Sequence, residues 1–265
     1  MISFFFQSAQ KQSHRFWIEA MLAGRAILFA GRRVSCPCCG WKLRSFTEGN
    51  TSLKKRKKGY CPRCNSKARH RRNWLFLKNH TDLFKKPTQL LHVSPKYALA
   101  RRFTKMANIE FTGIDLEGRP FAEHPIDVSD LPFQTNKFDA IICIHVLEHV
   151  VDDRAAIHEL HRVLKQGGWA LITVPIDFQR KTYEDPAIQS AEARKLHFGE
   201  EQHWRIYGDD FIDRLTTAGF DVELNRAEDI PGSIQNKFGI IENEHVFFCK
   251  KTNIPQQHDA VNLNK

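Results

Sequence analysis

Four cysteines in two short, matching segments are the residues of this sequence best suited to hold a metal ion. Cys36 and Cys39 stand in the run Cys-Pro-Cys-Cys-Gly, and Cys61 and Cys64 stand in Cys-Pro-Arg-Cys-Asn. The Cys-x-x-Cys spacing lets two thiolates reach one ion, and the glycine or asparagine that follows suits a left-handed backbone. Two such pairs complete the tetrahedral shell of a structural zinc site. We therefore predict that these four cysteines bind Zn²⁺ in a zinc ribbon.

Other residues near these pairs leave alternatives open. Cys38 is either a spare thiol or an alternate ligand, and His70 is a weaker candidate ligand. Free or redox-active thiols are the alternative to metal binding. A disulfide framework is less favoured, because we find no export signal at the N-terminus. The same observation leads us to expect a cytoplasmic protein.

Positive charge is concentrated in the first third of the chain. Residues 1–88 hold 20 Lys and Arg against 3 Asp and Glu, whereas residues 89–265 hold 20 against 27. The formal net charge of +10 therefore divides into +17 and −7, and the change of sign near Pro87 predicts a domain boundary. The basic runs lie at 54–58 and 69–72. Aromatic residues are interleaved with them, namely Trp41, Phe46, Tyr60 and Trp74. RNA contact and a solvated basic loop both fit this composition.

The second part of the chain alternates short apolar runs with helical stretches. The predicted strands are 89–93, 109–114, 126–128, 138–144, 169–174 and 244–250. The predicted helices are 95–106, 152–165 and 209–218. Asp152 is the expected N-cap of the second helix, and Gly167 and Gly168 are expected to end it. This alternation predicts an α/β fold: a Rossmann-like, doubly wound, mostly parallel seven-stranded sheet, preceded by the small zinc ribbon.

Polar residues stand where several of these strands end. Asp115 closes the second strand, Asp127 follows the third, and 145–149 (His-Val-Leu-Glu-His) follow the fourth. In a doubly wound sheet, ligands bind beyond the carboxyl ends of the strands. Asp115 can accept hydrogen bonds from both hydroxyls of a ribose, and Asp127 or a neighbouring backbone group can meet an adenine. A structural role, as a cap or loop anchor, fits each carboxylate equally well.

Three blocks in this part closely resemble the class I S-adenosylmethionine-dependent methyltransferases of the type 11 group. The blocks are residues 127–133, 138–150 and 159–168. The second cysteine pair, followed by 69–71 (Arg-His-Arg) and 74–77 (Trp-Leu-Phe-Leu), resembles the zinc-ribbon front end of one branch of that group. The resemblance implies a cofactor, S-adenosylmethionine. Together with the change of charge near Pro87, it leads us to divide the chain into four parts. The parts are a basic amphipathic helix (1–33), the zinc ribbon (34–88), the methyltransferase domain (89–252) and a flexible tail (253–265).

The resemblance also implies roles for single residues. Asp115 would hold the cofactor ribose and Asp127 the adenine edge, with Leu116 and Val128 beside them. His145 to His149 would face the sulfonium and the acceptor.

The segment after the first strand departs from the pattern of the group. Where an acidic residue and a Gly-x-Gly turn are usual, this chain has His92-Val93-Ser94-Pro95-Lys96. We include His92, Ser94 and Lys96 in the predicted cofactor site. Pro95 can begin the next helix, whose N-terminus, together with Lys96, can hold the cofactor carboxylate.

The insertion at about 176–207 is predicted to cover the strand ends as a lid. His149 and His203 are the candidates for a general base, because an imidazole titrates near neutral pH. Glu148 is a candidate to orient either of them.

The predicted function is methyl transfer to an acceptor that is a small or sugar-linked molecule. One alternative is an RNA methyltransferase in which the basic zinc module docks the RNA, and another is a binding protein that has lost the cofactor. The apolar stretch at 16–30 is too short to span a bilayer, so no transmembrane segment is expected. Packing against the rest of the protein suits this stretch better than binding to a membrane surface. The sequence specifies neither the acceptor atom nor the oligomeric state.

Overall fold

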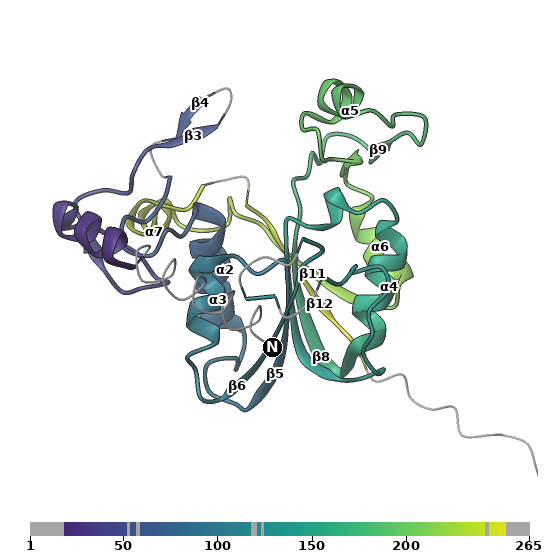
Figure 1. The fold of residues 1–265 in the computed structure, drawn as a ribbon, viewed down its shortest axis with the longest axis horizontal. Helices are drawn as coiled ribbons and strands as arrows, with labels where there is room; N and C mark the ends of the chain where they lie inside the picture. Colours follow the sequence, from purple (N-terminus) through teal and green to yellow (C-terminus); the bar gives the residue numbers. More distant parts are fainter. Residues whose placement is uncertain are drawn as a thin grey trace, which may run out of the picture.

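A six-stranded sheet with helices on both faces forms the centre of the computed structural model, which describes residues 19–51, 54–56, 59–117, 121–122, 125–241 and 244–252 (Figure 1). The order of its strands is β11-β12-β8-β7-β5-β6. Their bounds are β5 Thr88–Val93, β6 Ile109–Ile114, β7 Phe138–Ile144, β8 Leu164–Thr173, β11 Asp221–Asn225 and β12 Val246–Lys250. Strands β6, β5, β7 and β8 are parallel, and β12 is antiparallel to both of its neighbours. The doubly wound, mostly parallel sheet predicted from the sequence is confirmed.

The direction of winding reverses between β5 and β7. From β5 the chain moves outward to β6, and from β7 it moves outward the other way to β8. Such a reversal opens a crevice at the carboxyl ends of the two central strands. The switch point of this sheet therefore lies beyond Val93 and Ile144.

Two details of the predicted sheet are wrong. Within the described residues the central sheet has six strands rather than seven, and the expected strand at 126–128 is reduced to a single parallel bridge between Asp115 and Pro125. Asp127 turns the backbone there, because its Oδ1 accepts a hydrogen bond from the Ser129 amide at 2.9 Å. The helix expected at 152–165 ends at Val163, where β8 begins directly.

Each face of the sheet has its own layer of helices and its own core. Helices α4 (Asp153–Val163) and α6 (Phe211–Thr217) cover one face, and α2 (Ala68–His80) and α3 (Tyr97–Phe103) cover the other (Figure 1). The central strand β7 is buried on both sides, as its apolar sequence requires. Asp152 caps α4 as predicted, since its Oδ1 accepts a hydrogen bond from the Ala155 amide.

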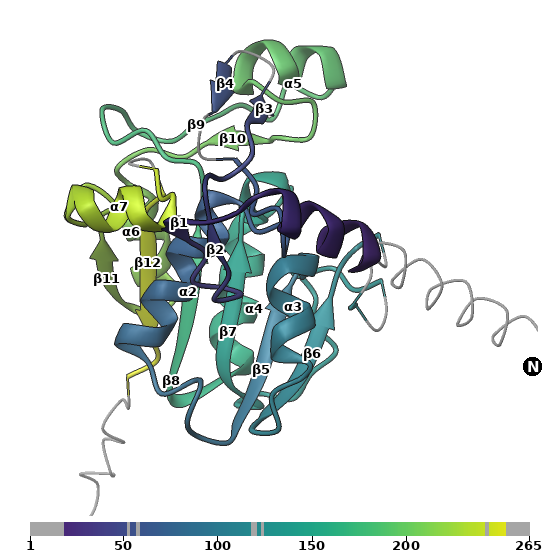
Figure 2. The ribbon, with the colours of Figure 1, turned by 90° about the vertical axis from the view of Figure 1, so that its left-hand side faces the viewer.

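The cysteine-rich segment packs on the face that carries α2 and α3. It consists of two short antiparallel pairs, β1 (Ala30–Ser35) with β2 (Lys42–Leu43) and β3 (Gly49–Thr51) with β4 (Lys54–Arg56). Its four clustered cysteines share one apolar core with aromatic side chains of α2. Helix α7 (Gly232–Phe238) lies beside β1, so a segment from late in the chain packs on the cysteine-rich segment (Figure 2).

Residues 19–28 form a helix that packs on α3. Leu22 and Ala26 are buried, and Glu19 accepts a hydrogen bond from Tyr97 and pairs with Arg101. Residues 19–28 of the predicted 1–33 helix are thus helical and packed, whereas 30–33 belong to strand β1 and were wrongly assigned to the helix. The predictions for residues 1–18 and for the tail at 253–265 lie outside the described residues. No described helix has the length and apolar character needed to cross a membrane.

The insertion at 176–207 forms a separate small unit above the carboxyl ends of the strands. A bridge between Ile176 and Tyr207 joins its two ends, and β9 (Tyr183–Glu184) pairs with β10 (Arg205–Ile206). Helix α5 (Ala191–Phe198) forms its tip (Figure 1). The unit occupies the position from which a lid would cover a ligand in the crevice.

Candidate functional site

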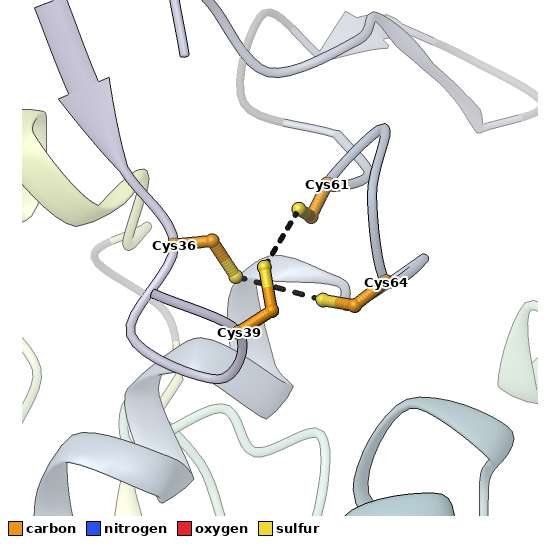
Figure 3. Close-up of side chains that lie close together, drawn as sticks. All are labelled: Cys36, Cys39, Cys61 and Cys64. Atoms are coloured by element: carbon orange, nitrogen blue, oxygen red, sulfur yellow. Dashed lines mark hydrogen bonds between the residues drawn. The ribbon is translucent and has the colours of Figure 1, made fainter. Parts of the chain in front are cut away.

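The four predicted zinc ligands converge from two turns (Figure 3). The sulfur atoms of Cys36 and Cys64 are 3.6 Å apart, and those of Cys39 and Cys61 are 3.8 Å apart. A tetrahedral zinc ion with Zn–S bonds of about 2.3 Å requires sulfur–sulfur separations of about 3.8 Å. All four ligand atoms lie within 4.8 Å of one another. The cluster therefore fits a metal ion of this size and geometry.

The two turns repeat one backbone device. The Gly40 amide donates to the Cys36 carbonyl at 2.7 Å, and the Asn65 amide donates to the Cys61 carbonyl at 2.8 Å. Gly40 has φ +71° and Asn65 has φ +58°, so both occupy the left-handed region expected from their residue types. Because the same kind of hydrogen bond closes both turns, the two thiols of each pair lie on the same side of their turn.

Cys38 and His70 lie outside this cluster. The Cys38 thiol is buried and points at the His70 carbonyl at 3.6 Å. The His70 ring accepts a hydrogen bond from the Lys67 amide at the start of α2. Of the alternatives left open by the sequence, the structure supports a spare thiol at Cys38.

Arg71 fastens the cysteine turns to the rest of the protein. Its buried guanidinium donates to the carbonyls of Gly59 and Ser66 on one side and of Phe238 and Gly239 on the other. These bonds join the segment beside the second turn to the end of α7. The charged residue predicted as part of a basic surface is therefore an internal tether.

The second basic run is a poor surface for a nucleic acid. His70, Arg71 and Arg72 are 4%, 0% and 2% exposed, and Arg72 donates to the Asn225 carbonyl. Phe46 and Trp74, two of the aromatic residues interleaved with the basic runs, are buried in the core. In the first run, Lys57 and Lys58 lie outside the described residues. The aromatic and basic pattern at 69–74 arises from packing.

A cleft of about 530 Å³ opens at the switch point of the sheet. Its walls contain most of the predicted cofactor residues, namely Ser94, Lys96, Asp115, Leu116, Asp127, Val128 and His145. The predicted acceptor residue His149 lies at its edge, and Arg194, Gln202 and Trp204 of the insertion close one side. A larger depression of about 700 Å³ lies at the amino ends of the strands, but it holds none of these residues. The volume of the cleft is within the range of small-molecule sites.

Ser94 supplies the backbone shape that the missing glycine would give. Its φ is +48°, in the left-handed region, and its amide donates to the Ile114 carbonyl at 2.7 Å. A non-glycine residue held there costs about 1 kcal/mol or more. The Lys96 ammonium donates to Ser94 Oγ at 3.0 Å, so the lysine lies against this turn at the cleft. The departure from the glycine pattern therefore keeps the turn and adds a positive charge.

His92 does not line the cleft, contrary to its inclusion in the cofactor site. Strand residues alternate between the two faces, so Val93 reaches the cleft while His92 points toward α3. The His92 ring packs edge-on against Phe103 and Phe111. Burial lowers its pKa to about 3, so the ring is uncharged. His92 is a core residue on the opposite side of β5.

The carboxylates at the strand ends have different surroundings. Asp115 is 6% exposed, and its Oδ1 accepts a hydrogen bond from the Glu117 amide at 3.0 Å. Asp127 is exposed, and its Oδ1 accepts from both the amide and the hydroxyl of Ser129. Leu116 is 68% exposed beside the cleft, where it offers an apolar surface. Asp115 is thus the carboxylate held within the wall of the cleft.

His145 lies between two carboxylates after β7. His145 Nδ1 is 3.2 Å from Glu148 Oε1, and His145 Nε2 is 3.5 Å from Glu244. Burial lowers the pKa of His145, but the two carboxylates raise it more, so the net shift is upward. Burial raises the pKa of Glu148, but His145 lowers it more. His145 has φ +52°, a strained conformation of the kind that concentrates at functional sites.

The two predicted base candidates meet beside Glu148. Glu148 and His149 belong to a single turn, η1 (Leu147–His149), and His203 comes from the insertion. The rings of His149 and His203 are in edge-to-face contact with centroids 4.8 Å apart. Only His149 of these three lines the cleft itself. Glu148 is 1% exposed and lies behind it.

Arg205, with its buried neighbours, holds the insertion against η1. Its guanidinium donates to the carbonyls of Leu147, Val150 and Val151 and to the Glu184 carboxylate. The Trp204 amide also donates to the Glu148 carbonyl at 2.9 Å. These bonds fix the relative positions of His203 and the turn that carries His149.

Some residues of the site were not predicted from the sequence. Arg194 and Trp204 line the cleft, with the Arg194 guanidinium 4.3 Å from the centre of the Trp204 ring. Arg214 pairs with Asp153 and Glu184 behind Arg205. The sequence indicates only that these residues lie in or next to the predicted insertion. It does not indicate which of their side chains point toward the cleft.

The chain matches known methyltransferases over part of its length. Residues 97–172 match the family model described as a methyltransferase domain. The demethylmenaquinone methyltransferase of Clavibacter sepedonicus is 40% identical over 62 residues, which are 22% of this chain and 25% of that protein. A probable S-adenosylmethionine-dependent methyltransferase of Mycolicibacterium smegmatis is 27% identical over 97 residues, or 37% of this chain and 34% of that protein. The chain thus spans about a quarter to a third of these relatives.

Among solved structures, an S-adenosylmethionine-dependent methyltransferase of Mesorhizobium loti aligns with 67% of this chain and 96% of its own. Its identity to this chain is 13% and the TM-score is 0.46. The matched segment runs from α3 to β8 of the doubly wound sheet, so this part of the chain is similar to a methyltransferase domain, in agreement with the sequence resemblance.

Proposed function

We propose that the protein transfers a methyl group from S-adenosylmethionine to an acceptor bound under the insertion. The observation that carries this proposal is the cleft at the switch point, where Asp115, Leu116 and His145 lie within the segment that matches the family model. A carboxylate, an apolar side chain and an imidazole from two neighbouring segments provide the kinds of contact that a charged nucleoside needs.

Each wall of the cleft offers one kind of contact to the cofactor. Asp115 can accept hydrogen bonds from ribose hydroxyls, Leu116 can pack on the adenine ring, and Lys96 can pair with the carboxylate. The left-handed turn at Ser94 preserves the local backbone shape that the usual glycines give. When bound, the cofactor supplies a methyl carbon activated by a positively charged sulfur.

The acceptor is expected beside His149, which lines the cleft and whose ring contacts that of His203. Burial lowers the pKa of His203, so its imidazole is uncharged at neutral pH and can accept a proton. The buried Glu148 carboxylate lies close enough to orient the two rings. The residues of the chain thus hold the acceptor and manage its proton.

We favour a small or sugar-linked acceptor over RNA. The Clavibacter relative is by its name a methyltransferase of demethylmenaquinone, a small molecule. The basic run at 69–72 is largely internal, which removes part of the surface that RNA docking would use. Incubating the protein with methyl-labelled cofactor and fractionated cell extracts would decide between them. Label in the small-molecule fraction is expected, and label in RNA would favour the docking alternative.

Calorimetric titration with S-adenosylmethionine and its demethylated product tests the cofactor site. We expect the wild type to bind both and Asp115→Ala to bind at least about tenfold more weakly, a loss of about 1.4 kcal/mol. Asp130→Ala is the matched control, because Asp130 is an exposed carboxylate outside the cleft wall. A wild-type protein that gives no heat with either compound would contradict the proposal and favour a binding protein without this cofactor.

We also propose that Cys36, Cys39, Cys61 and Cys64 bind one structural Zn²⁺. The support is the set of sulfur separations and the paired turns that produce them. Four thiolates leave no open position on a tetrahedral ion, so this site organises the fold and takes no part in the reaction.

A further inference from the structure

A second cluster of metal-binding side chains lies at the acceptor end of the cleft. One ligand atom from each of Glu148, His149 and His203 lies within 4.8 Å of the others. Two of these residues come from η1 and the third from the insertion, so the cluster exists where the two segments meet. Two imidazoles and one carboxylate are the donor set of catalytic sites for divalent transition metals, which keep positions open for a substrate.

The carboxylate of this cluster has an unsatisfied atom. Glu148 Oε1 pairs with His145, but Oε2 is buried and has no hydrogen-bond partner. A charged oxygen taken out of water without a partner costs free energy unless a cation or donor reaches it. A metal ion between Glu148 and the two rings would supply that partner.

The two imidazoles are arranged as metal ligands usually are. His149 Nδ1 is 3.2 Å from the Gln202 carbonyl, so it can donate its proton there and leave a lone pair on Nε2. The His203 ring is hydrogen-bonded to the backbone of Phe198, and its Nε2 is 3.7 Å from the exposed Glu200 carboxylate. Metal-binding histidines commonly donate their second ring proton to a backbone carbonyl.

We propose that Glu148, His149 and His203 bind a divalent transition-metal ion, and that this ion takes the hydroxyl oxygen of the methyl acceptor. This inference rests on the proposed function and narrows its acceptor to an alcohol or a phenol. Because His149 borders the cleft, an ion held by its ring lies at the place where an acceptor meets the cofactor.

The role of the ion is to make the acceptor oxygen a better nucleophile. Coordination lowers the pKa of the hydroxyl. Its proton passes to solvent water, because His149 and His203 then act as metal ligands and not as the general base. The oxygen then forms a bond to the methyl carbon while the carbon–sulfur bond breaks, and sulfur keeps the electron pair. The products are a methyl ether and a neutral thioether, with one proton released and no change of oxidation state.

Titration with Mn²⁺ tests the site in the full-length protein carrying one equivalent of Zn²⁺. Manganese prefers nitrogen and oxygen ligands, so it competes poorly for the four thiolates. Free Mn²⁺ is measured by electron paramagnetic resonance. We expect one Mn²⁺ per chain in the wild type and at least about tenfold weaker binding in His149→Ala and His203→Ala. His158→Ala is the control, because His158 is exposed on α4, and it is expected to bind like the wild type.

Two results would overturn the proposed metal site: a wild type that binds no Mn²⁺, or histidine variants that bind it as tightly as the control. Binding of the demethylated cofactor is measured on the same preparations, which shows that the variants are folded. A wild type that binds this nucleoside but no Mn²⁺ refutes the metal site alone. A wild type that does not bind the nucleoside refutes the proposed function and, with it, the role of the ion in methyl transfer.

Discussion

The cysteine site and the cleft assemble their functional groups in different ways. The four thiols come from two short turns, each closed by one backbone hydrogen bond between neighbouring residues. The cleft draws instead on the ends of β5, β6 and β7 and on an insertion far along the chain. A site built from local turns leaves its spacing in the sequence. A site built across a sheet depends on how distant segments pack.

The two regions nevertheless share one means of support. In each, a buried guanidinium donates to several backbone carbonyls: Arg71 beside the cysteine turns and Arg205 beside η1. The difference is in what the arginine joins. Arg71 joins the cysteine turns to α7, whereas Arg205 joins the insertion to the turn η1 beside the cleft. Substitutions should therefore affect the two regions unequally.

The largest effect is expected at the cysteine site. Cys61→Ser removes one thiolate and with it most of the zinc, whose binding free energy of about 10 kcal/mol or more is linked to folding. We expect zinc content to fall and the melting temperature to drop sharply, as measured by elemental analysis and circular dichroism. Cys38→Ala is the matched control, with full zinc content and a loss of only about 1–2 kcal/mol. Equal loss of zinc in both variants would show that Cys38 is a ligand.

The next effect is expected at the insertion. Arg205→Leu removes the donor that three backbone carbonyls share and one of the two guanidiniums that pair with Glu184. Breaking a buried pair of this kind costs about 3–5 kcal/mol. Urea denaturation should show this loss. Arg180→Leu breaks an exposed pair with Asp177 and should cost less than about 1 kcal/mol. Similar values for the two variants would mean that the insertion is not anchored through Arg205.

The smallest effect is expected in the pH dependence of stability, through His92, which belongs to neither site. Burial lowers the pKa of His92 to about 3, against 6.5 for the ordinary side chain. Between these pH values the His92 ring is protonated in the unfolded chain but not in the folded chain. The free energy of unfolding therefore falls as the pH decreases below 6.5. The slope contributed is at most about 1.4 kcal/mol per pH unit.

Urea denaturation at pH 7.5 and at pH 5.5 measures this slope. His92→Leu should be less sensitive to the change of pH than the wild type, although the buried His70 shifts in the same direction and leaves part of the slope. His158→Ala should keep the full slope. An unchanged slope in His92→Leu would show that the ring is not buried in the folded protein.

Much of the fold could be predicted from periodicity. The strands at 109–114 and 138–144 lie where apolar runs placed them, and Asp152 caps α4 as its residue type suggested. The expected strand near Asp127 failed for a local reason. The carboxylate bonds its own following residues, and that turn competes with sheet pairing.

The sites could be predicted to different extents. Spacing located all four clustered cysteines, and the ends of strands located Asp115. Which face a strand residue occupies was harder, so His92 was included although it points into the core. The burial of Arg71 and Arg72 could not be predicted, because their partners lie near residues 225–239. Long-range contacts of this kind leave no pattern in a single sequence.

The contacts of Arg71 have a consequence for how the protein unfolds. One side chain bonds both the region beside a cysteine turn and the end of α7, and Gly239 there packs so closely on Phe46 that a methyl group would not fit. Neither the cysteine-rich segment nor α7 can detach without breaking contacts of the other. Heating should thus produce a single calorimetric transition, and a fragment cut near Pro87 would lose cooperativity in both halves.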